Sequence, residues 1–321
     1  MKYAFIINPI AGNGKKAEKL CKEIEAVSLD TEYDIEVRLT TGPGSATSIA
    51  DRLASAAGHA GEEIRIYACG GDGTVNEVAN GIYGHANAAL GIIPIGSGND
   101  FIRNFGGDRP TDYRDLMSQL LAEEEAIDVM SYSYKADGVD CRRIGLNSFN
   151  IGFDGNVAIL ATYFNKRTVI GGSMSYALSI FLNLIEKSGQ NLQVTVDGER
   201  IFKGPLMLCT IANGRFCGGG IEGSPRAQLD DGLADVLVVH KIPRRTVLKI
   251  LPRFAKGKIF EVEAARDIIE YRQGQQIHIL PRNGHMKFVV DGEIIETGEL
   301  DVEMKRDRKS TRLNSSHALA S

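Results

Sequence analysis

The first 130 residues alternate short apolar runs with longer segments whose apolar residues recur at helical spacing. Short apolar runs bounded by turn signals are typical of buried strands, and the longer spacing is typical of amphipathic helices. Such alternation predicts a parallel sheet with helices on its faces. The predicted strands are 3–8, 33–40, 64–69 and 90–95, and the predicted helices are 15–27, 45–57 with Ser45 as N-cap, and 75–83.

After residue 125 the pattern changes to strand-like runs separated by turn signals. Asp197-Gly198 and Asp291-Gly292 stand between apolar runs, where an Asp-Gly pair is a strong hairpin signal. The second half is therefore predicted to be rich in β-structure, with helices only near 157–163, 173–186 and 245–260. The predicted strands are 128–134, 192–196, 200–203, 206–212, 234–240, 276–280 and 287–290.

The composition is that of an ordinary globular protein, with 43% hydrophobic and 24% charged residues. The five cysteines form no CxxC pair, which indicates reduced thiols in a cytosolic protein instead of disulfides or a zinc site. No apolar stretch approaches the roughly 20 residues that a membrane-spanning helix needs. The N-terminal segment also lacks the features of a signal peptide. We therefore expect a cytoplasmic protein without a transmembrane segment.

The last fifteen residues, 307–321, are typical of a translated sequencing adapter, and we expect them to be a non-native tail. They carry three basic residues and one acidic residue, whereas the whole chain has a formal net charge of −4. The remaining 306 residues therefore carry about −6 by this count of charges. An acidic chain of this kind argues against general binding of nucleic acid.

The segment Gly70-Gly71-Asp72-Gly73-Thr74 follows a predicted strand and opens a predicted helix. Its glycines allow a sharp turn and a close approach of the backbone to phosphate, and the first amides of the helix favour an anion. A carboxylate in such a loop repels phosphate unless a divalent cation lies between them, which suggests Mg²⁺. From these residues alone, a plain Asp-Gly turn explains the segment equally well.

A series of motifs follows in order along residues 1–306. They are Asn8-Pro9 with Gly12, GGDGTVNEVAN at 70–80, IIPIGSGND at 92–100 with Phe101 and Arg103, Gly152-Phe153-Asp154, Asn213-Gly214-Arg215, DDGLAD at 230–235, and Asp291-Gly292-Glu293. Together these motifs resemble the diacylglycerol kinase and sphingosine kinase family, and the likeness is greatest to the soluble bacterial lipid kinases of that family.

The resemblance implies a two-domain lipid kinase or NAD kinase-like fold. Residues 1–128 would form an α/β nucleotide-binding domain with a parallel sheet, and residues 129–306 a β-rich lipid-substrate domain. It also implies ATP and Mg²⁺ as cofactors, and it leaves open a homodimer paired through the second domain.

The resemblance also assigns roles to individual residues. Asn8 and Thr40 would flank the nucleotide, and Ser97 would contact phosphate. The phosphates would lie over Gly70, Gly71, Asp72, Gly73, Thr74, Val75 and Asn76. An Mg²⁺ network would involve Asp72, Asp100, Arg103 and Asp128, and a second, structural Mg²⁺ would bind Asp231 with the carbonyls of Gln228 and Leu233.

Glu293 would be the general base under the same resemblance. A lipid hydroxyl is a poor nucleophile, and a carboxylate within hydrogen-bond reach can accept its proton during phosphoryl transfer. From the residues alone, Asp291-Gly292 favours a plain hairpin turn. The two interpretations are compatible, since a rigid turn can present the base.

Residues 241–258 contain seven basic residues and no acidic one, interleaved with apolar positions. Such a segment could lie on anionic lipid, each cation near the surface contributing roughly 1 kcal/mol. Alternatively, its apolar side packs on the second domain and its basic side chains face solvent. Pro252 is expected to break the helix under either interpretation.

We therefore expect an ATP-dependent kinase that phosphorylates a lipid hydroxyl at a membrane surface, with diacylglycerol as the leading acceptor. Such an enzyme would work at the inner face of the membrane as a peripheral protein. One alternative is an NAD kinase-like enzyme acting on a soluble dinucleotide, because GGDGT occurs there too. Another is a catalytically silent nucleotide-binding regulator.

Overall fold

The computed structural model describes residues 1–105, 113–136, 138–152, 190–306 and 312–315. The chain divides into two compact units. Unit 1 comprises Met1–Asp128 and Arg306–Ser321, and unit 2 comprises Val129–Lys305. The helices predicted at 157–163 and 173–186 lie outside the described residues.

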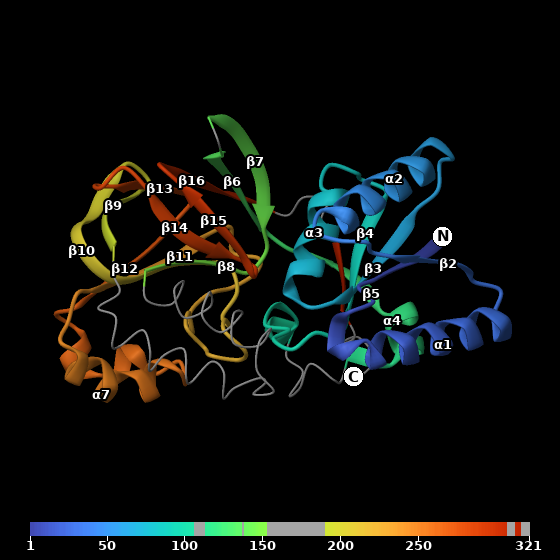
Figure 1. Cartoon of the computed structure of the whole chain (residues 1–321), viewed down its shortest axis with the longest axis horizontal. Coiled ribbons are helices and arrows are strands. Elements are labelled where there is room, and N and C mark those ends of the chain that lie inside the picture. The colour runs from blue at the N-terminus through green and yellow to red at the C-terminus, as the bar shows by residue number, and fades with distance from the viewer. Residues whose placement is uncertain (106–112, 137, 153–189, 307–311, 316–321) are drawn as a thin grey trace. The chain divides into compact units, whose positions relative to one another are not determined.

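Unit 1 is built on a sheet in which four neighbouring strands run parallel, in the order β2-β1-β3-β4 (Figure 1). This arrangement confirms the α/β prediction for the first part of the chain. The strands are β1 (Lys2–Ile7), β2 (Asp34–Leu39), β3 (Ile64–Gly70) and β4 (Ala88–Pro94), with β5 (Glu123–Ala126) at the edge, and the helices are α1 (Lys15–Asp30), α2 (Ser45–His59), α3 (Asp72–Ile82) and α4 (Leu116–Leu121).

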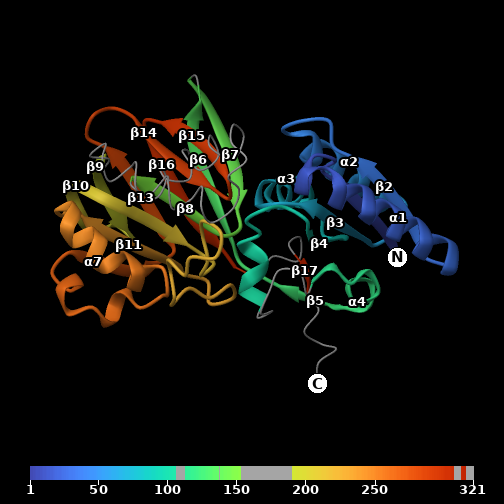
Figure 2. The same cartoon turned by 60° about the horizontal axis from the view of Figure 1, so that its bottom comes forward.

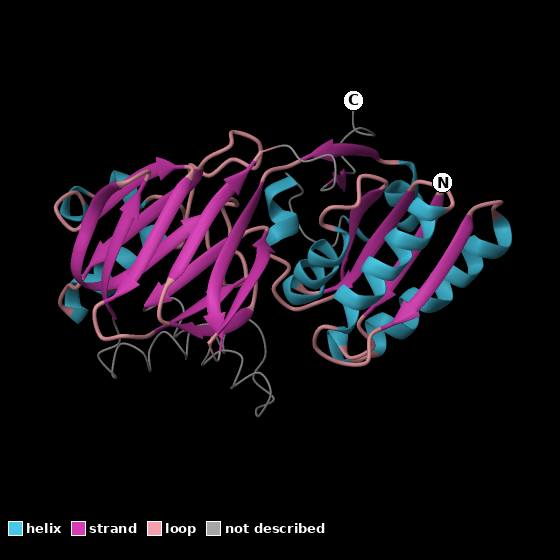
Figure 3. Cartoon of the chain, turned by 90° about the horizontal axis from the view of Figure 1, so that it is seen from above, coloured by secondary structure: helices cyan, strands magenta, loops and turns pink. Residues whose placement is uncertain are grey.

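Helices cover both faces of this sheet (Figure 3). Side chains alternate between the faces of a strand, so that Phe5 and Ile7 point to one side and their neighbours to the other. Phe5 and Ile7 pack with Leu20 of α1 and Leu120 of α4, whereas α2 and α3 contact β1, β3 and β4. With both faces covered, β1 and β4 read as nearly continuous apolar runs in the sequence, whereas β2 at the edge is mostly exposed.

The segment set aside as a tail includes a short strand, β17 (Arg312–Ser315), between β4 and β5. Leu313 pairs in parallel with Leu90 and antiparallel with Glu125. The prediction that residues 307–321 are non-native concerns the origin of the sequence, and it stays a prediction.

Unit 2 is β-rich, as predicted, and most of its strands pair antiparallel in the order β15-β14-β8-β10-β9-β13-β16-β6-β7. A further strand, β11, pairs with β10 and β12. The strands are β6 (Val129–Ala136), β7 (Val139–Gly145), β8 (Ser148–Gly152), β9 (Gln190–Val196), β10 (Glu199–Ala212), β11 (Ala234–His240), β12 (Ile269–Gly274), β13 (Gln276–Pro281), β14 (Met286–Val290), β15 (Glu293–Thr297) and β16 (Leu300–Lys305).

Two predicted strands, 200–203 and 206–212, form the single strand β10 of 14 residues. Gly204-Pro205 does not end it, although the pair is a turn signal in the sequence. The strand pairs with β9 along its first half and with β8 and β11 along its second, with register shifts on both sides of the pair. Tertiary pairing on both edges therefore overrides the local signal.

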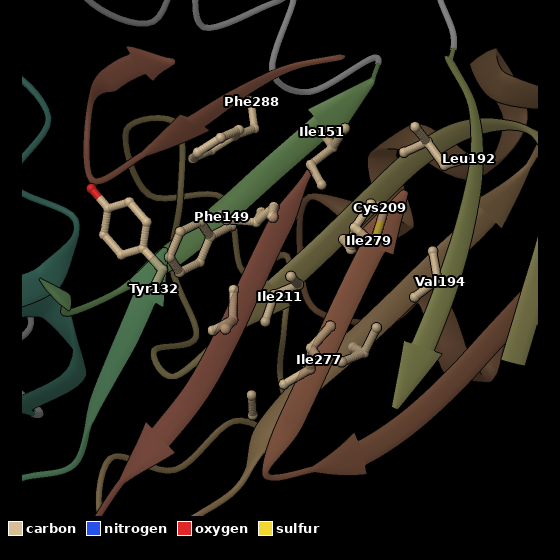
Figure 4. Close-up of a cluster of buried hydrophobic side chains, with 14 of the residues drawn as sticks. Tyr132, Phe149, Ile151, Leu192, Val194, Cys209, Ile211, Ile277, Ile279 and Phe288 are labelled. Atoms are coloured by element: carbon tan, nitrogen blue, oxygen red, sulfur yellow. The ribbon is translucent and has the colours of Figure 1, made fainter. Parts of the chain in front are cut away.

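The core of unit 2 contains side chains from most of these strands, including Phe149, Ile211, Ile277 and Phe288 (Figure 4). Tyr132 lies at the edge of this cluster, with its ring 5.0 Å from that of Phe149 between centroids. A buried aromatic group of this kind fixes the relative positions of β6, β8 and β14 through its packing.

The predicted helix at 245–260 is present as α7 (Arg244–Phe254), followed by a 3-10 turn, η4 (Ile259–Glu261). Figure 2 shows α7 beside β11, and Ile250 and Phe254 pack with Leu208 and Leu237. The apolar side of the helix is therefore occupied by protein, which favours the packing interpretation of 241–258. The prediction that Pro252 breaks the helix is wrong, because the packed Phe254 holds the last turn. In the described part of the chain, no helix is both long and apolar enough to cross a membrane.

Candidate active site

The loops that follow β1, β2, β3 and β4 all lie at the carboxyl edge of the parallel sheet, where ligands bind in open α/β sheets. The amide of Asn8 donates to the Cys69 carbonyl (2.9 Å), and that of Thr40 donates to the Ile7 carbonyl (3.0 Å). The Asn8 side chain also reaches the Thr74 hydroxyl at 3.5 Å. The structure thus brings Asn8, Thr40 and the Gly70–Thr74 loop to one edge of the sheet.

Two glycine-rich loops pack backbone to backbone at this edge. The Gly70 carbonyl accepts from the amides of Ile95 (3.1 Å) and Gly96 (2.9 Å). A Cβ atom on Gly96 would lie 2.4 Å from the Gly71 Cα, which no side chain can tolerate. At Gly73, in contrast, an added Cβ would meet nothing within 4 Å. The loop therefore has open space above the first turn of α3, where helix amides favour an anion.

Asp72 and Asp100 come together beside these loops. The Asp72 Oδ1 accepts from the Phe101 amide at 3.1 Å, and a Cβ on Gly98 would lie 3.1 Å from Asp72 Oδ2 and 3.8 Å from Asp100 Oδ2. Burial raises the pKa of Asp72, and backbone amides such as that of Phe101 only partly offset this. Arg103 Nε lies 3.6 Å from Asp100 Oδ1. The carboxylates of Asp72, which is partly exposed, and of the buried Asp100 thus face one glycine.

This arrangement fits a hard divalent cation with oxygen ligands. Burial raises the pKa of Asp72, and a cation beside Asp72 and Asp100 would instead stabilise the charged form of both carboxylates. The Asn99 Oδ1 atom is buried without a hydrogen-bond partner among the described residues. An amide oxygen of this kind is a further possible ligand for a cation. Asn99 adopts a left-handed conformation (φ 54°), which turns the loop between Gly98 and Asp100.

Glu77 is a residue whose role the sequence did not reveal. Its carboxylate accepts from the amides of Gly44 (2.9 Å) and Ala46 (3.0 Å) and so caps α2. The prediction of Ser45 as N-cap is wrong, because Gly44 precedes the helix and Glu77 of α3 provides the oxygen. A carboxylate from another helix leaves no local capping signal in the sequence.

Two further predicted residues of unit 1, Ser97 and Asp128, differ in exposure. Ser97 is exposed in the loop after β4, whereas Asp128, the last residue of unit 1, has only 1% of its surface exposed. The roles of Ser97 in phosphate contact and of Asp128 in a magnesium network stay predictions.

In unit 2, Asp291-Gly292 forms the two-residue turn between β14 and β15, with positive φ at both residues (45° and 91°). The hairpin interpretation is therefore confirmed. The buried Asp291 carboxylate accepts from the amides of Leu146 (2.6 Å), Asn147 (3.0 Å) and Ser148 (3.1 Å). These bonds fasten the turn to the segment between β7 and β8.

Glu293 is the first residue of β15, directly after this turn, and it is partly buried. Its Oε2 accepts a hydrogen bond from Nη1 of Arg143, which lies on β7. Arg143 is a second residue that the sequence did not reveal. It is 150 positions from Glu293 and belongs to none of the motifs.

The predicted structural metal site lies in the loop before β11. Asp231 Oδ1 accepts from the Leu233 amide at 2.9 Å, so these two residues are together, while the Gln228 side chain is exposed. One carboxylate and two carbonyl oxygens would suit Mg²⁺. A different group in the described residues, His278 with Glu299 and Asp301, has side chains close enough to share a cation, but all three are at least partly exposed.

Comparisons with known proteins identify the family to which the two units belong. Residues 2–132 match the family described as "Diacylglycerol kinase catalytic domain", and residues 147–307 match the "YegS C-terminal NAD kinase beta sandwich-like domain". A "Probable lipid kinase YegS-like" of Chromohalobacter salexigens is 32% identical over 293 residues, covering 88% of this chain and 85% of that protein.

A "Diacylglycerol kinase" of Bacillus subtilis is 27% identical over 262 residues, with 80% of each chain covered. The crystal structure of a diacylglycerol kinase from Bacillus anthracis superposes with a TM-score of 0.69 at 22% identity, covering 99% of this chain and 98% of that one. At this identity, the structural likeness shows that the two chains share a fold.

Proposed function

The chain belongs to the diacylglycerol kinase catalytic-domain family, with the YegS type of C-terminal domain, and from this premise we propose that it transfers the γ-phosphoryl group of MgATP to a lipid hydroxyl. Diacylglycerol, converted to phosphatidate, is the acceptor that we propose. The observation that carries the proposal is the pair of carboxylates, Asp72 and Asp100, that face Gly98 beside an open glycine loop.

In unit 1, the proposed role of the residues is to hold and orient the triphosphate. The backbone of Gly71 to Thr74 would bind phosphate oxygens, with Asn8 and Thr40 at the sides of the nucleotide. Asp72 and Asp100 would hold Mg²⁺, which when bound neutralises charge on the transferring phosphoryl group. Arg103 keeps Asp100 in place through their ion pair, and its own positive charge supports the same site.

In unit 2, the proposed role of Glu293 is to accept the proton of the acceptor hydroxyl. The acceptor oxygen forms a bond to the γ-phosphorus, the bond from that phosphorus to the bridging oxygen of ADP breaks, and the proton moves to the carboxylate. The Asp291-Gly292 turn, fastened by three backbone amides, would hold the carboxylate in a fixed position. Asp231 with the Gln228 and Leu233 carbonyls would bind the second, structural Mg²⁺.

The direct test offers radiolabelled ATP to the purified chain with a mixed lipid extract, with and without Mg²⁺, and identifies the labelled product by mass spectrometry. We expect labelled phosphatidate, formed only with Mg²⁺. A parallel reaction with NAD tests the dinucleotide alternative. A labelled dinucleotide, or ATP binding without transfer to any acceptor, would overturn the proposal.

The Glu293→Ala variant tests the assignment of the base. Because positioned bases typically contribute about a hundredfold or more, phosphatidate formation should fall by at least that factor while circular dichroism stays unchanged. Turnover near that of the wild type would remove Glu293 from the mechanism.

A further inference from the structure

Arg143 makes a direct and partly buried contact with Glu293. Its Nη1 donates to Glu293 Oε2, and only 25% of the Arg143 side chain and 34% of the Glu293 side chain are exposed. Exposed ion pairs between flexible side chains contribute little, but a partly buried pair is screened less by water and salt. This contact therefore restrains the orientation of the carboxylate.

Aromatic side chains hold Arg143 in turn. Tyr132 on β6 lies directly opposite Arg143 on β7. The rings of Tyr132 and Tyr134 stack with their centroids 5.7 Å apart. Burial by itself lowers the pKa of Arg143, but its interactions with Tyr132, Glu293 and Tyr134 outweigh this and raise it above its ordinary value. The guanidinium thus stays charged, in contact with Glu293 and opposite Tyr132 on the neighbouring strand.

Tyr132 has a hydroxyl group that the fold does not use. The side chain is 1% exposed, and its oxygen has no hydrogen-bond partner among the described residues. Figure 4 shows this oxygen directed away from Phe149 and the apolar cluster. Burial raises the pKa of Tyr132, so the phenol is neutral, and the charges of Arg143 and Glu293 both act on it. A buried polar group without a hydrogen-bond partner costs free energy. The Tyr132 hydroxyl is such a group, and the charges near it are those of the Arg143–Glu293 pair.

The hydrogen bond from Arg143 engages one carboxylate oxygen of Glu293. The other oxygen, Oε1, receives no hydrogen bond from the described residues. The backbone that carries Glu293 is fixed by Asp291, so the side chain alone decides where Oε1 points. A base with one oxygen held and one oxygen open is suited to accept a proton from a single direction.

We propose that Arg143 is the positioning residue of the general base, which holds Oε2 of Glu293 so that Oε1 receives the proton of the acceptor hydroxyl. Tyr132 keeps the guanidinium in place from the neighbouring strand. This inference rests on the proposed function. If Arg143 instead inhibited the enzyme and had to release Glu293 before turnover, removing Arg143 would raise kcat, whereas a positioning role predicts that kcat falls.

The experiment measures kcat and KM for dispersed lipid acceptor in a double-mutant cycle of Arg143→Ala and Glu293→Gln, with Arg143→Lys as the conservative variant. Arg142→Ala is the matched control, because this neighbouring arginine is exposed on the opposite face of the same strand. We expect Arg143→Ala to lower kcat by about tenfold, a part of what a positioned base contributes, with KM nearly unchanged. Arg143→Lys should retain part of the kcat that Arg143→Ala loses, and Arg142→Ala should not lower kcat.

The cycle separates a positioning role from a structural one. If Arg143 acts through Glu293, its removal should cause no further loss in the Glu293→Gln background. Equal losses in both backgrounds would indicate a structural role and overturn the inference, as would unchanged or increased kcat in Arg143→Ala. A fully active Glu293→Gln variant would instead refute the assignment of the base itself, so the two failures are distinguishable.

Discussion

The two units present their candidate functional groups in different ways. In unit 1, each of the two glycine loops, 70–74 and 96–100, is a single short stretch of sequence, and the backbones of the two loops contact each other directly. In unit 2, Glu293 contacts Arg143 of another strand, which lies opposite Tyr132 of a third strand, and it follows a turn fastened to the segment between β7 and β8. The glycine loops of unit 1 are therefore visible as local sequence motifs. The surroundings of Glu293 in unit 2 arise from packing between residues far apart in the chain.

The largest effect is expected at the carboxylate inside the glycine loop. Asp72→Asn should lower turnover by about a hundredfold to a thousandfold, as loss of one preorganised electrostatic group commonly does. The same variant should bind Mg²⁺-ATP more weakly in calorimetry. Full turnover in this variant would refute the metal-bound phosphate interpretation of unit 1.

Asp72→Asn also makes a prediction about pH that does not depend on activity. Burial raises the pKa of Asp72 in the folded chain above its unfolded value. The stability associated with the protonated form is therefore lost as pH rises through the raised folded pKa. In the absence of nucleotide, the Tm of Asp72→Asn relative to wild type should increase from acidic to neutral pH, and a constant difference would contradict this.

In unit 2, the turn that carries Glu293 should be the most sensitive point for stability. Asp291→Ala leaves three buried amides without an acceptor, and we expect a loss of about 3 kcal/mol, seen as a lower Tm. Asp197→Ala is the matched control, because Asp197 occupies the same position of an Asp-Gly turn (φ 48°) and accepts from two amides, but it is exposed. Water can replace its bonds, so its loss should be clearly smaller.

In unit 1, two glycine substitutions separate packing of the loops from space for the ligand. Gly96→Ala places a methyl group against the Gly71 backbone and should cost about 1–3 kcal/mol of stability, as overpacking does. Gly73→Ala meets open space, so Tm should be unchanged or slightly higher. If phosphate occupies that space, Gly73→Ala should still weaken ATP binding; unchanged affinity would place the phosphate elsewhere.

The smallest effect is expected on the exposed side of α7. Arg245, Lys249 and Arg253 are exposed and recur every four residues, on the side away from the packed Ile250 and Phe254. Lys249→Gln should weaken binding to anionic vesicles by about fivefold, corresponding to about 1 kcal/mol, and should not change binding to zwitterionic vesicles.

The exposed Lys19 on α1 provides the control, since Lys19→Gln should leave vesicle binding unchanged. Equal effects of the two variants would mean that only net charge matters, and that α7 is not the surface that meets the lipid.

Much of unit 1 could be predicted from the sequence because its signals are local. Apolar runs and helical spacing located β1, β3, α1 and α2 to within a few residues, and the glycine motifs located the edge where Asp72 and Asp100 meet. The cap of α2 was wrong because Glu77 approaches from another helix. In unit 2, the strands β7, β8, β12, β15 and β16 were not predicted. For β7 and β8 the reason is that short strands of mixed polarity carry weak periodicity.

The sequence by itself determined the order of the first four strands and three helices of unit 1, the glycine-rich turns and the family to which the chain belongs, because all of these depend on neighbouring residues or on ordered motifs. Only the tertiary structure decided that Gly204-Pro205 continues a strand, that α7 covers its apolar side with protein, and that Arg143 holds Glu293. These outcomes depend on contacts between residues far apart in the chain, and no local pattern records such contacts.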